Sequence, residues 1–369
     1  MKLLPRSEKF SAIGMSITNL QIHAIQLKGR GKSLKIGRML KLPRLLDDQG
    51  KVKALDAKML SRLRMALDAN GFQGSNLILS VPEDQLLSSM IELPPINGKI
   101  PVNQIAKLEM SRIHHCQPED FELASWVLPS ADRSNKNAQV IATIFLHEQA
   151  DKLLDLFEDS NFNVLAIDIL PQALARACHH FHSTTAQRTI LHHSFDSIHI
   201  VSLDNKTIIY ERRIADLGLA KLISHIQNKF NIQDKQAAIR LIQQAGFQND
   251  PIDPKDTSQS YSQTPGIRKM ANDHYQKILQ ELGNALAYTK QQYSKMSSQE
   301  IFLTGLGNDI PGWKLIIQQS LESKTNLVHP VDLLPCAEHL KSDEQIKEPG
   351  YLPAIGLALY HQGGTRAAS

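Results

Sequence analysis

The chain has 369 residues, of which 42% are hydrophobic and 21% are charged, and its formal net charge at pH 7 is +4. This composition is that of an ordinary soluble globular protein with room for about two domains, or one large divided domain. The Lys and Arg residues are scattered and are not interleaved with aromatic residues, which argues against nucleic acid as a partner.

The cysteine spacing and the lack of long apolar segments point to the cytoplasm. Cys116, Cys178 and Cys336 lie far apart without CxxC spacing, which favours reduced thiols. The N-terminus lacks the apolar run of a signal peptide, and no stretch approaches the roughly 18 apolar residues of a membrane span. We therefore expect a cytoplasmic protein that reaches a membrane only through a partner.

The first part of the chain predicts a strand meander followed by a helix and another strand. Three runs rich in Ile, Leu and Met, around residues 11–16, 20–27 and 34–42, are separated by short polar turns. A helix is indicated next by one apolar face, made of Met59, Leu60, Leu63 and Leu67. The segment NLILSV, residues 76–81, then predicts a buried strand.

A similar order of elements returns near residue 188. The segments TILHHSF, SIHIVSL and TIIYERRI predict three strands, and a helix follows with Leu219, Leu222, Ile223 and Ile226 on one face. A further strand is expected at residues 301–304. Two meanders, each followed by helices and more strands, predict a duplicated α/β architecture with a cleft between its halves.

The material between the two copies predicts a small inserted α+β subdomain. It comprises a short strand at 90–95, a helix around 102–115, the strands FELASWVL and AQVIATIFL, and a helix whose face includes Leu153 and Phe157. We therefore expect residues 1–82 and 164–186 to form the first half, 83–163 the insert and 187–369 the second half, with boundaries good to several residues.

One glycine-containing turn leaves two interpretations open. Residues 301–313, IFLTGLGNDIPGW, predict a strand, a turn with two glycines and the start of a helix. Such a turn can bring backbone N–H groups close to a nucleotide, or it can simply reverse the chain. The residues alone do not decide between the two.

Five stretches in chain order carry a resemblance to a known family: SVPEDQLLSSMIELPP, FELASWVL, FNVLAIDILPQALARA, IFLTGLGNDIPGW and YLPAIGLALY. Together they resemble the PilM family of cytoplasmic type IV pilus assembly proteins, including divergent relatives in MSHA-type pilus systems. The resemblance implies a duplicated actin-like (ribonuclease H-like) fold. It also implies that the insert is the extra α+β subdomain shared with the cell-division protein FtsA.

The resemblance further implies a site for ATP and Mg²⁺ in the cleft, with two Asp-x-Gly hairpins at the phosphates and a glycine-rich turn at the adenosine. In this chain the first hairpin has Ser16 and Thr18 at the Asp and Gly positions, and Asn19 where a small hydroxyl residue is usual. The second hairpin has His192 and Ser194 at those positions. The adenosine turn is retained as Gly305, Leu306 and Gly307.

Because both metal-holding acids are replaced, the charge of a triphosphate would be left largely uncompensated. We therefore expect a degenerate site with no nucleotide, or with weakly bound ATP or ADP and Mg, and a pseudo-ATPase without catalytic residues. The alternative is an active ATP-binding ATPase of pilus or secretion machinery.

The resemblance also implies a partner, the cytoplasmic tail of a PilN-like inner-membrane protein at the pilus assembly platform. In the family that tail lies in a groove between the first half and the insert, where strand-like pairing and apolar pockets would hold it. We expect the wall of this groove at Ser88, Ser89, Met90, Ile91, Glu92 and Leu93. The alternative is that this strand meets only its own sheet.

The histidines raise a metal hypothesis. Cys178 and His182 have the i, i+4 spacing that zinc ligands adopt on a helix, and His114-His115-Cys116 ends another predicted helix. Histidines at a helix C-terminus also complement the helix dipole and face water. We favour this second interpretation and predict no metal site. No G-x-S-x-G motif supports a catalytic triad.

Overall fold

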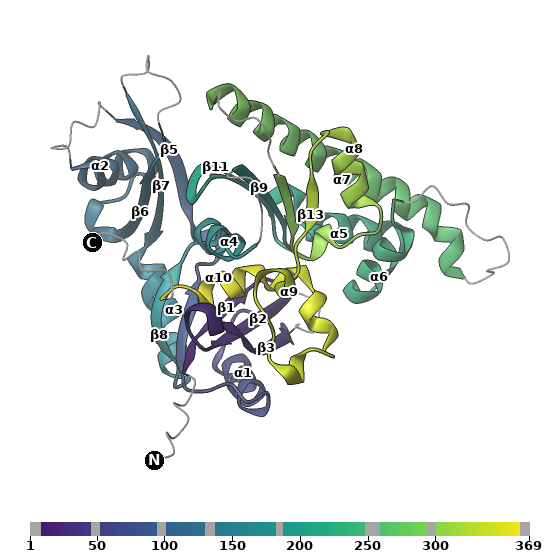
Figure 1. Ribbon diagram of the computed structural model, residues 1–369, viewed down its shortest axis with the longest axis horizontal. Coiled ribbons are helices and arrows are strands. Elements are labelled where there is room, and N and C mark those ends of the chain that lie inside the picture. Colours follow the sequence, from purple (N-terminus) through teal and green to yellow (C-terminus); the bar gives the residue numbers. More distant parts are fainter. Residues whose placement is uncertain are drawn as a thin grey trace.

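The computed structural model describes residues 9–45, 52–93, 101–129, 137–181, 187–247, 259–293 and 300–361. In this part of the chain, helices cover two larger sheets and one smaller sheet (Figure 1). The helices are α1 (Ala57–Ala69), α2 (Val102–His114), α3 (His147–Glu158), α4 (Leu170–Cys178), α5 (Leu219–Phe230), α6 (Lys235–Ala245), α7 (Gln259–Gln292), α8 (Trp313–Ser320), α9 (Pro330–Leu333) and α10 (Leu352–Ala358).

The first half is built on a five-stranded sheet. Its strands are β1 (Phe10–Ile17), β2 (Gln21–Lys28), β3 (Lys35–Pro43), β4 (Asn76–Ser80) and β8 (Asn163–Asp168), in the order β3-β2-β1-β4-β8. The first three strands pair antiparallel, while β4 is parallel to β1 and β8 is parallel to β4. Helix α1 begins after Asp56, whose carboxylate accepts a hydrogen bond from the Met59 N–H. Its predicted apolar face is buried in the core of this half.

The second half repeats this sheet. Its strands are β9 (Gln187–His193), β10 (Ile198–Asp204), β11 (Thr207–Ile214), β12 (Glu300–Thr304) and β13 (Thr325–Leu327), in the order β11-β10-β9-β12-β13. Again the meander is antiparallel, β12 is parallel to β9 and β13 is parallel to β12. Helices α5, α6 and α7 contribute side chains to one continuous core with this sheet. The predicted duplication of a three-stranded meander with a further parallel strand is therefore confirmed, and β8 and β13 extend the two sheets beyond the strands that were predicted.

The insert is a three-stranded antiparallel sheet with one helix. Its strands are β5 (Leu87–Leu93), β6 (Phe121–Val127) and β7 (Ala138–Leu146), in the order β5-β7-β6. Helix α2 packs on one face of this sheet through Ala106 and Met110. The other face approaches the body of the molecule, where Phe145 packs with Val81 and Ile169 of the first half.

Two helices belong to other units than the sequence predicted. Helix α3, expected in the insert, buries Phe157 in the core of the first half, so the insert ends before residue 163. Helix α10, expected in the second half, packs against α4 and β1 of the first half. That packing is close, since a Cβ on Gly14 of β1 would lie 2.2 Å from the Ala354 carbonyl oxygen. Small residues let this C-terminal helix return to the first half.

Candidate functional site

Most of the residues expected at a nucleotide come together between the two halves. Six of them line one small cavity at the ends of the β1–β2 and β9–β10 hairpins: Ser16, Thr18, His192, Ser194, Gly305 and Leu306. Asn19 lies in the same turn as Thr18, and its backbone N–H donates to Asp196 Oδ2 at 2.9 Å. This hydrogen bond links the two hairpins across the cleft. Gly307 is buried behind the turn, against the ring of His193.

The cavity that these residues enclose is small. Its volume is about 20 Å³, which holds about one water molecule. Pockets that bind small molecules and cofactors usually measure roughly 300–1,000 Å³. Part of the space is taken by Leu20, which lies in the turn of the first-half hairpin and packs against the core of the second half.

The hydroxyl side chains at the two Gly positions, Thr18 and Ser194, bond within their own turns. Thr18 Oγ1 donates to the Gln21 carbonyl at 3.0 Å, and Ser194 Oγ donates to the Ser197 carbonyl, also at 3.0 Å. The Ser194 oxygen also accepts from the Ser197 N–H at 3.1 Å. Ser and Thr commonly close turns in this way. In both hairpins the side chain therefore stabilises the backbone of its own loop.

The glycine turn is fastened to its surroundings. Gly305 has a φ of +88°, and a Cβ there would lie 2.4 Å from the His193 carbonyl oxygen, so only glycine fits without strain. Its N–H donates to the Pro349 carbonyl at 3.0 Å. The Gly307 carbonyl accepts from the Tyr275 hydroxyl, and Trp313 Nε1 donates to Asn308 Oδ1 at 2.9 Å. The fold thus needs this turn, whether or not a nucleotide binds.

A polar cavity of about 350 Å³ opens beside Leu20 and Leu306. Its charged lining includes both signs: Lys41, Arg240, Asp309, Glu344, Lys347 and Glu348. Glu348 lies 2.6 Å from Lys41 Nζ and 3.4 Å from His23 Nε2. Burial alone would raise the Glu348 pKa, but the hydrogen bonds and charges of His23 and Lys41 outweigh it and lower that pKa to about 2.

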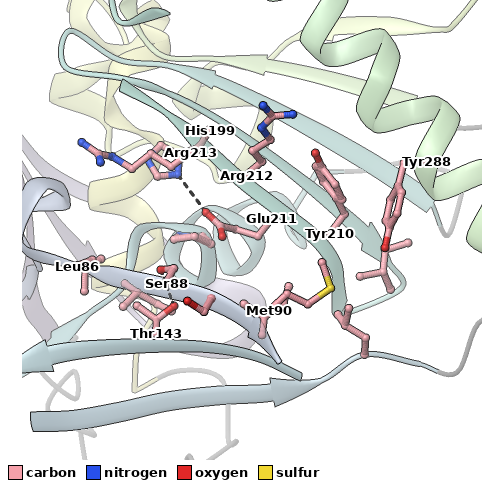
Figure 2. A pocket seen from close by; sticks show the side chains of 16 residues that line it. Leu86, Ser88, Met90, Thr143, His199, Tyr210, Glu211, Arg212, Arg213 and Tyr288 are labelled. Carbon is pink, nitrogen blue, oxygen red and sulfur yellow. Dashed lines mark hydrogen bonds and ion pairs between the residues drawn. The ribbon is translucent and has the colours of Figure 1, made fainter. Parts of the chain in front are cut away.

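A third cavity, of about 340 Å³, lies between the insert and the second half (Figure 2). We call it the insert groove. Of the expected groove residues, Ser88, Ser89 and Met90 line it, whereas Ile91 and Leu93 are buried in the core of the insert. Glu92 is exposed and is not part of the lining.

The opposite wall of the insert groove differs from the expectation. The first half contributes Ile169 and Pro171, while most of that wall is β11 of the second half, with Tyr288 of α7. This wall was not predicted from the sequence. The run Glu211-Arg212-Arg213 inside an otherwise apolar strand segment was its one available signal, because charges on a strand mark an edge or an open face.

The groove combines apolar and polar contacts. Its apolar lining consists of Leu86, Met90, Leu128, Ile141, Ile169, Pro171 and Ile209. Ser88 Oγ and Thr143 Oγ1 hydrogen-bond to each other at 2.9 Å. On the far wall Glu211 Oε1 lies 3.7 Å from His199 Nδ1, and Arg212 Nη1 lies 2.9 Å from Glu281 Oε2. Glu211 and Arg212 of this wall are thus held by partners on β10 and α7.

The histidine and cysteine positions are spread through the fold. Cys178 is buried in the core, and burial raises its thiol pKa to about 12 against the opposing charge of Arg188. His182 lies outside the described residues. His114 Nε2 lies 3.2 Å from Ser89 Oγ. Within the ranges that the structure describes, no group of three or more His, Cys, Asp or Glu side chains is arranged to hold a metal ion.

Two sheets of equal strand order around a cleft, with a subdomain inserted in the first, define an actin-like fold. MreB5 of Spiroplasma citri bound to AMPPNP has it too, with a TM-score of 0.50 and 9% identity over 94% of this chain and 95% of that one. A PilM-PilN type IV pilus biogenesis complex matches with a TM-score of 0.73 and 16% identity, over 95% of this chain and 98% of that one.

The family described as type IV pilus assembly protein PilM matches residues 14–362, so the chain belongs to that family. No curated protein sequence matches the chain. None of the helices in the described part of the chain has the length and apolarity needed to cross a membrane.

Proposed function

We propose that this protein is an adaptor of a type IV-like pilus assembly platform, possessing a degenerate nucleotide site. It docks on the cytoplasmic tail of a PilN-like inner-membrane protein, and this tail lies in the insert groove. Membership of the PilM family and the fold shared with the PilM-PilN complex support the partner. One observation carries the assignment: the expected phosphate position holds only about 20 Å³ and the cavity of about 350 Å³ beside it is polar, whereas the insert groove offers about 340 Å³ with a largely apolar lining.

The degenerate site is supported by side-chain chemistry. A triphosphate in the cleft needs Mg²⁺, and Mg²⁺ needs carboxylate ligands. Ser16 and His192 stand where those acids are expected, and Ser194 bonds within its own turn. Entry of a phosphate would also require Leu20 to move away from the apolar core of the second half, against which it packs. Both requirements oppose binding.

Calorimetry with Mg-ATP and with Mg-ADP tests this part of the proposal. We expect dissociation constants weaker than about 100 μM for both nucleotides, and no phosphate release above background. The alternative function, an active ATPase, predicts low-micromolar binding with turnover. That result would mean that other groups, such as those lining the polar cavity beside Leu306, hold the phosphates and metal.

A pair of matched variants tests the docking site. Met90 and Leu108 are both large apolar residues of the insert, 52% and 61% exposed, but only Met90 lines the groove. Met90→Arg should block capture of the PilN-like tail by placing a charged side chain among apolar groups, and Leu108→Arg should leave capture unchanged. Equal capture by both variants would move the docking site away from the insert groove.

A further inference from the structure

The two halves are joined at the centre of the molecule and meet again across the cleft. Helices α4 and α10 lie between the two large sheets and share one apolar core cluster with residues of both sheets (Figure 1). Units that are joined through a pair of packed helices can move relative to one another by hinge or shear motion. A nucleotide bound by both hairpins would oppose that motion. Without a nucleotide, contacts within the chain decide whether the cleft stays closed.

The first contact across the cleft is made by Asp196, in the turn of the β9–β10 hairpin. Its Oδ2 accepts a hydrogen bond from the Asn19 N–H of the first half at 2.9 Å. Arg44, directly after β3, interacts electrostatically with Asp196, and its Nη1 donates to the Thr18 carbonyl at 3.1 Å. One carboxylate of the second half thus faces an N–H group and a guanidinium group of the first half. Hydrogen bonds to an ionised group are among the strongest in proteins.

The second contact is made by Glu348 and the residue that follows it. The Glu348 carboxylate accepts from Lys41 Nζ at 2.6 Å and from Gln21 Nε2 at 3.4 Å, both in the first half. The carbonyl of Pro349 accepts from the Gly305 N–H of the second half at 3.0 Å. Because the proline ring fixes its own φ and restricts the residue before it, these two adjacent residues form a stiff link between the halves.

Three consecutive residues of the first half take part in these contacts. Asn19 donates to Asp196, Leu20 packs against the core of the second half, and Gln21 donates to Glu348. We infer that Asp196 and Glu348, together with residues 19–21, form a clasp that holds the cleft closed in place of a nucleotide. This inference rests on the proposed degenerate nucleotide site and is independent of where the partner tail docks.

A distance measured between the two halves tests the clasp. Met65 of α1 and Leu315 of α8 are 66% and 56% exposed, so Met65→Cys and Leu315→Cys place one nitroxide label on each half. The background carries Cys116→Ser and Cys336→Ala, while Cys178 is buried and is not labelled. Double electron–electron resonance then gives the distribution of distances in the full chain, without nucleotide and with Mg-ATP.

Two double variants are compared. With the clasp intact and no nucleotide we expect one narrow distance, which Mg-ATP does not change. Asp196→Ala with Glu348→Gln should broaden the distribution about twofold or add a longer distance. Asp216→Ala with Glu344→Gln is the matched control, because these acids are 88% and 85% exposed and pair within their own part of the molecule. The control should keep the narrow distance.

Circular dichroism shows whether the clasp variant is folded. If it is not, Lys41→Met takes its place, since Lys41 is 37% exposed and its loss removes only one contact of Glu348.

The possible outcomes separate the clasp from the degenerate site. A narrow distance in the folded clasp variant would overturn the clasp and leave the degenerate site standing. A broad distribution with the clasp intact, narrowed by Mg-ATP, would overturn both, because a nucleotide would then be what closes the cleft. Broadening in the clasp variant that Mg-ATP reverses would support the clasp and contradict the degenerate site.

Discussion

The central cleft and the insert groove differ in how their polar groups are used. In the cleft, Thr18 and Ser194 bond to their own loops, Asn19 is linked to Asp196, and the remaining cavity measures about 20 Å³. In the insert groove, apolar and polar side chains of the insert and of both halves surround about 340 Å³. The residues at the expected nucleotide positions thus close the space for the phosphates and leave a polar cavity of about 350 Å³ beside it, whereas the junction of the insert leaves a groove with a largely apolar lining. A position that corresponds to a nucleotide site in the actin-like fold therefore does not by itself show that this chain binds a nucleotide there.

Substitutions can separate the two regions. A substitution in the cleft should change the stability of the fold and leave tail binding intact, whereas a substitution in the insert groove should change tail binding and leave stability nearly intact.

The largest effect is expected at the glycine turn. Gly305 and Gly74 both have positive φ, +88° and +77°, but a Cβ on Gly305 would meet the His193 carbonyl while one on Gly74 meets nothing within 4 Å. Gly305→Ala should cost about 3 kcal/mol of stability and Gly74→Ala about 1 kcal/mol.

Urea unfolding of both glycine variants measures these costs. Because Gly305 lies outside the insert groove, the Gly305→Ala protein that remains folded should still capture the tail peptide. Equal stability losses in the two variants would show that the contact with His193 relaxes freely. Loss of tail capture by a folded Gly305→Ala protein would show that the cleft and the groove are coupled.

The next effect is expected at Glu348 and depends on pH. Its pKa is lowered from 4.5 to about 2, so its ionised form stabilises the fold above pH 4.5, and this contribution is lost as pH falls toward 2. Glu348→Gln should therefore lower stability at pH 7 by about 2 kcal/mol, and the gap to the unsubstituted protein should narrow between pH 4.5 and pH 3.

Chemical denaturation at several pH values measures the Glu348 contribution. Glu344→Gln is the control, because Glu344 is 85% exposed and its pair with Lys347, at 3.2 Å, should contribute less than about 1 kcal/mol. A gap for Glu348→Gln that stays constant down to pH 3 would contradict the assigned ion pair with Lys41 and hydrogen bond with His23.

Features that depend on residues near one another in the sequence were predicted correctly, and features that depend on residues far apart in the sequence were not. Both meanders and α1 were predicted because alternation and helical periodicity are local signals. The same periodicity marks Phe157 of α3 as buried but does not say in which core, so α3 was placed in the insert. The packing of Leu20 against the core of the other half and the approach of β5 and β11 to one cavity depend on tertiary arrangement. No local pattern encodes either.

A smaller effect is expected at Leu20, which closes the cleft from the first-half side. Leu20 is half-buried and packs on the core of the second half, so Leu20→Ala should cost about 1 kcal/mol. The cleft would widen, but Mg-ATP should still bind no better than before, because Ser16 and His192 supply no carboxylate. Calorimetry and urea unfolding check the two parts. Strong Mg-ATP binding by Leu20→Ala would identify Leu20, and not the missing acids, as the barrier.

The smallest effect is expected at Arg212, on the far wall of the insert groove. Arg212 pairs with Glu281 of α7 at 2.9 Å and is 48% exposed, and Arg64 of α1 pairs with Asp68 at 3.3 Å and is 35% exposed. Because both are surface ion pairs, Arg212→Met and Arg64→Met should each change stability by less than about 1 kcal/mol. Arg212 lines the groove and ties β11 to α7, whereas Arg64 lies elsewhere. Only Arg212→Met should therefore weaken tail binding, by about two- to fivefold, as measured by fluorescence anisotropy of a labelled tail peptide at low and high salt.

Equal weakening of tail binding by both variants would mean that the tail responds to the overall charge of the protein. That result would contradict docking of the tail in the insert groove, and the difference between the cleft and the groove would then not explain where the partner binds.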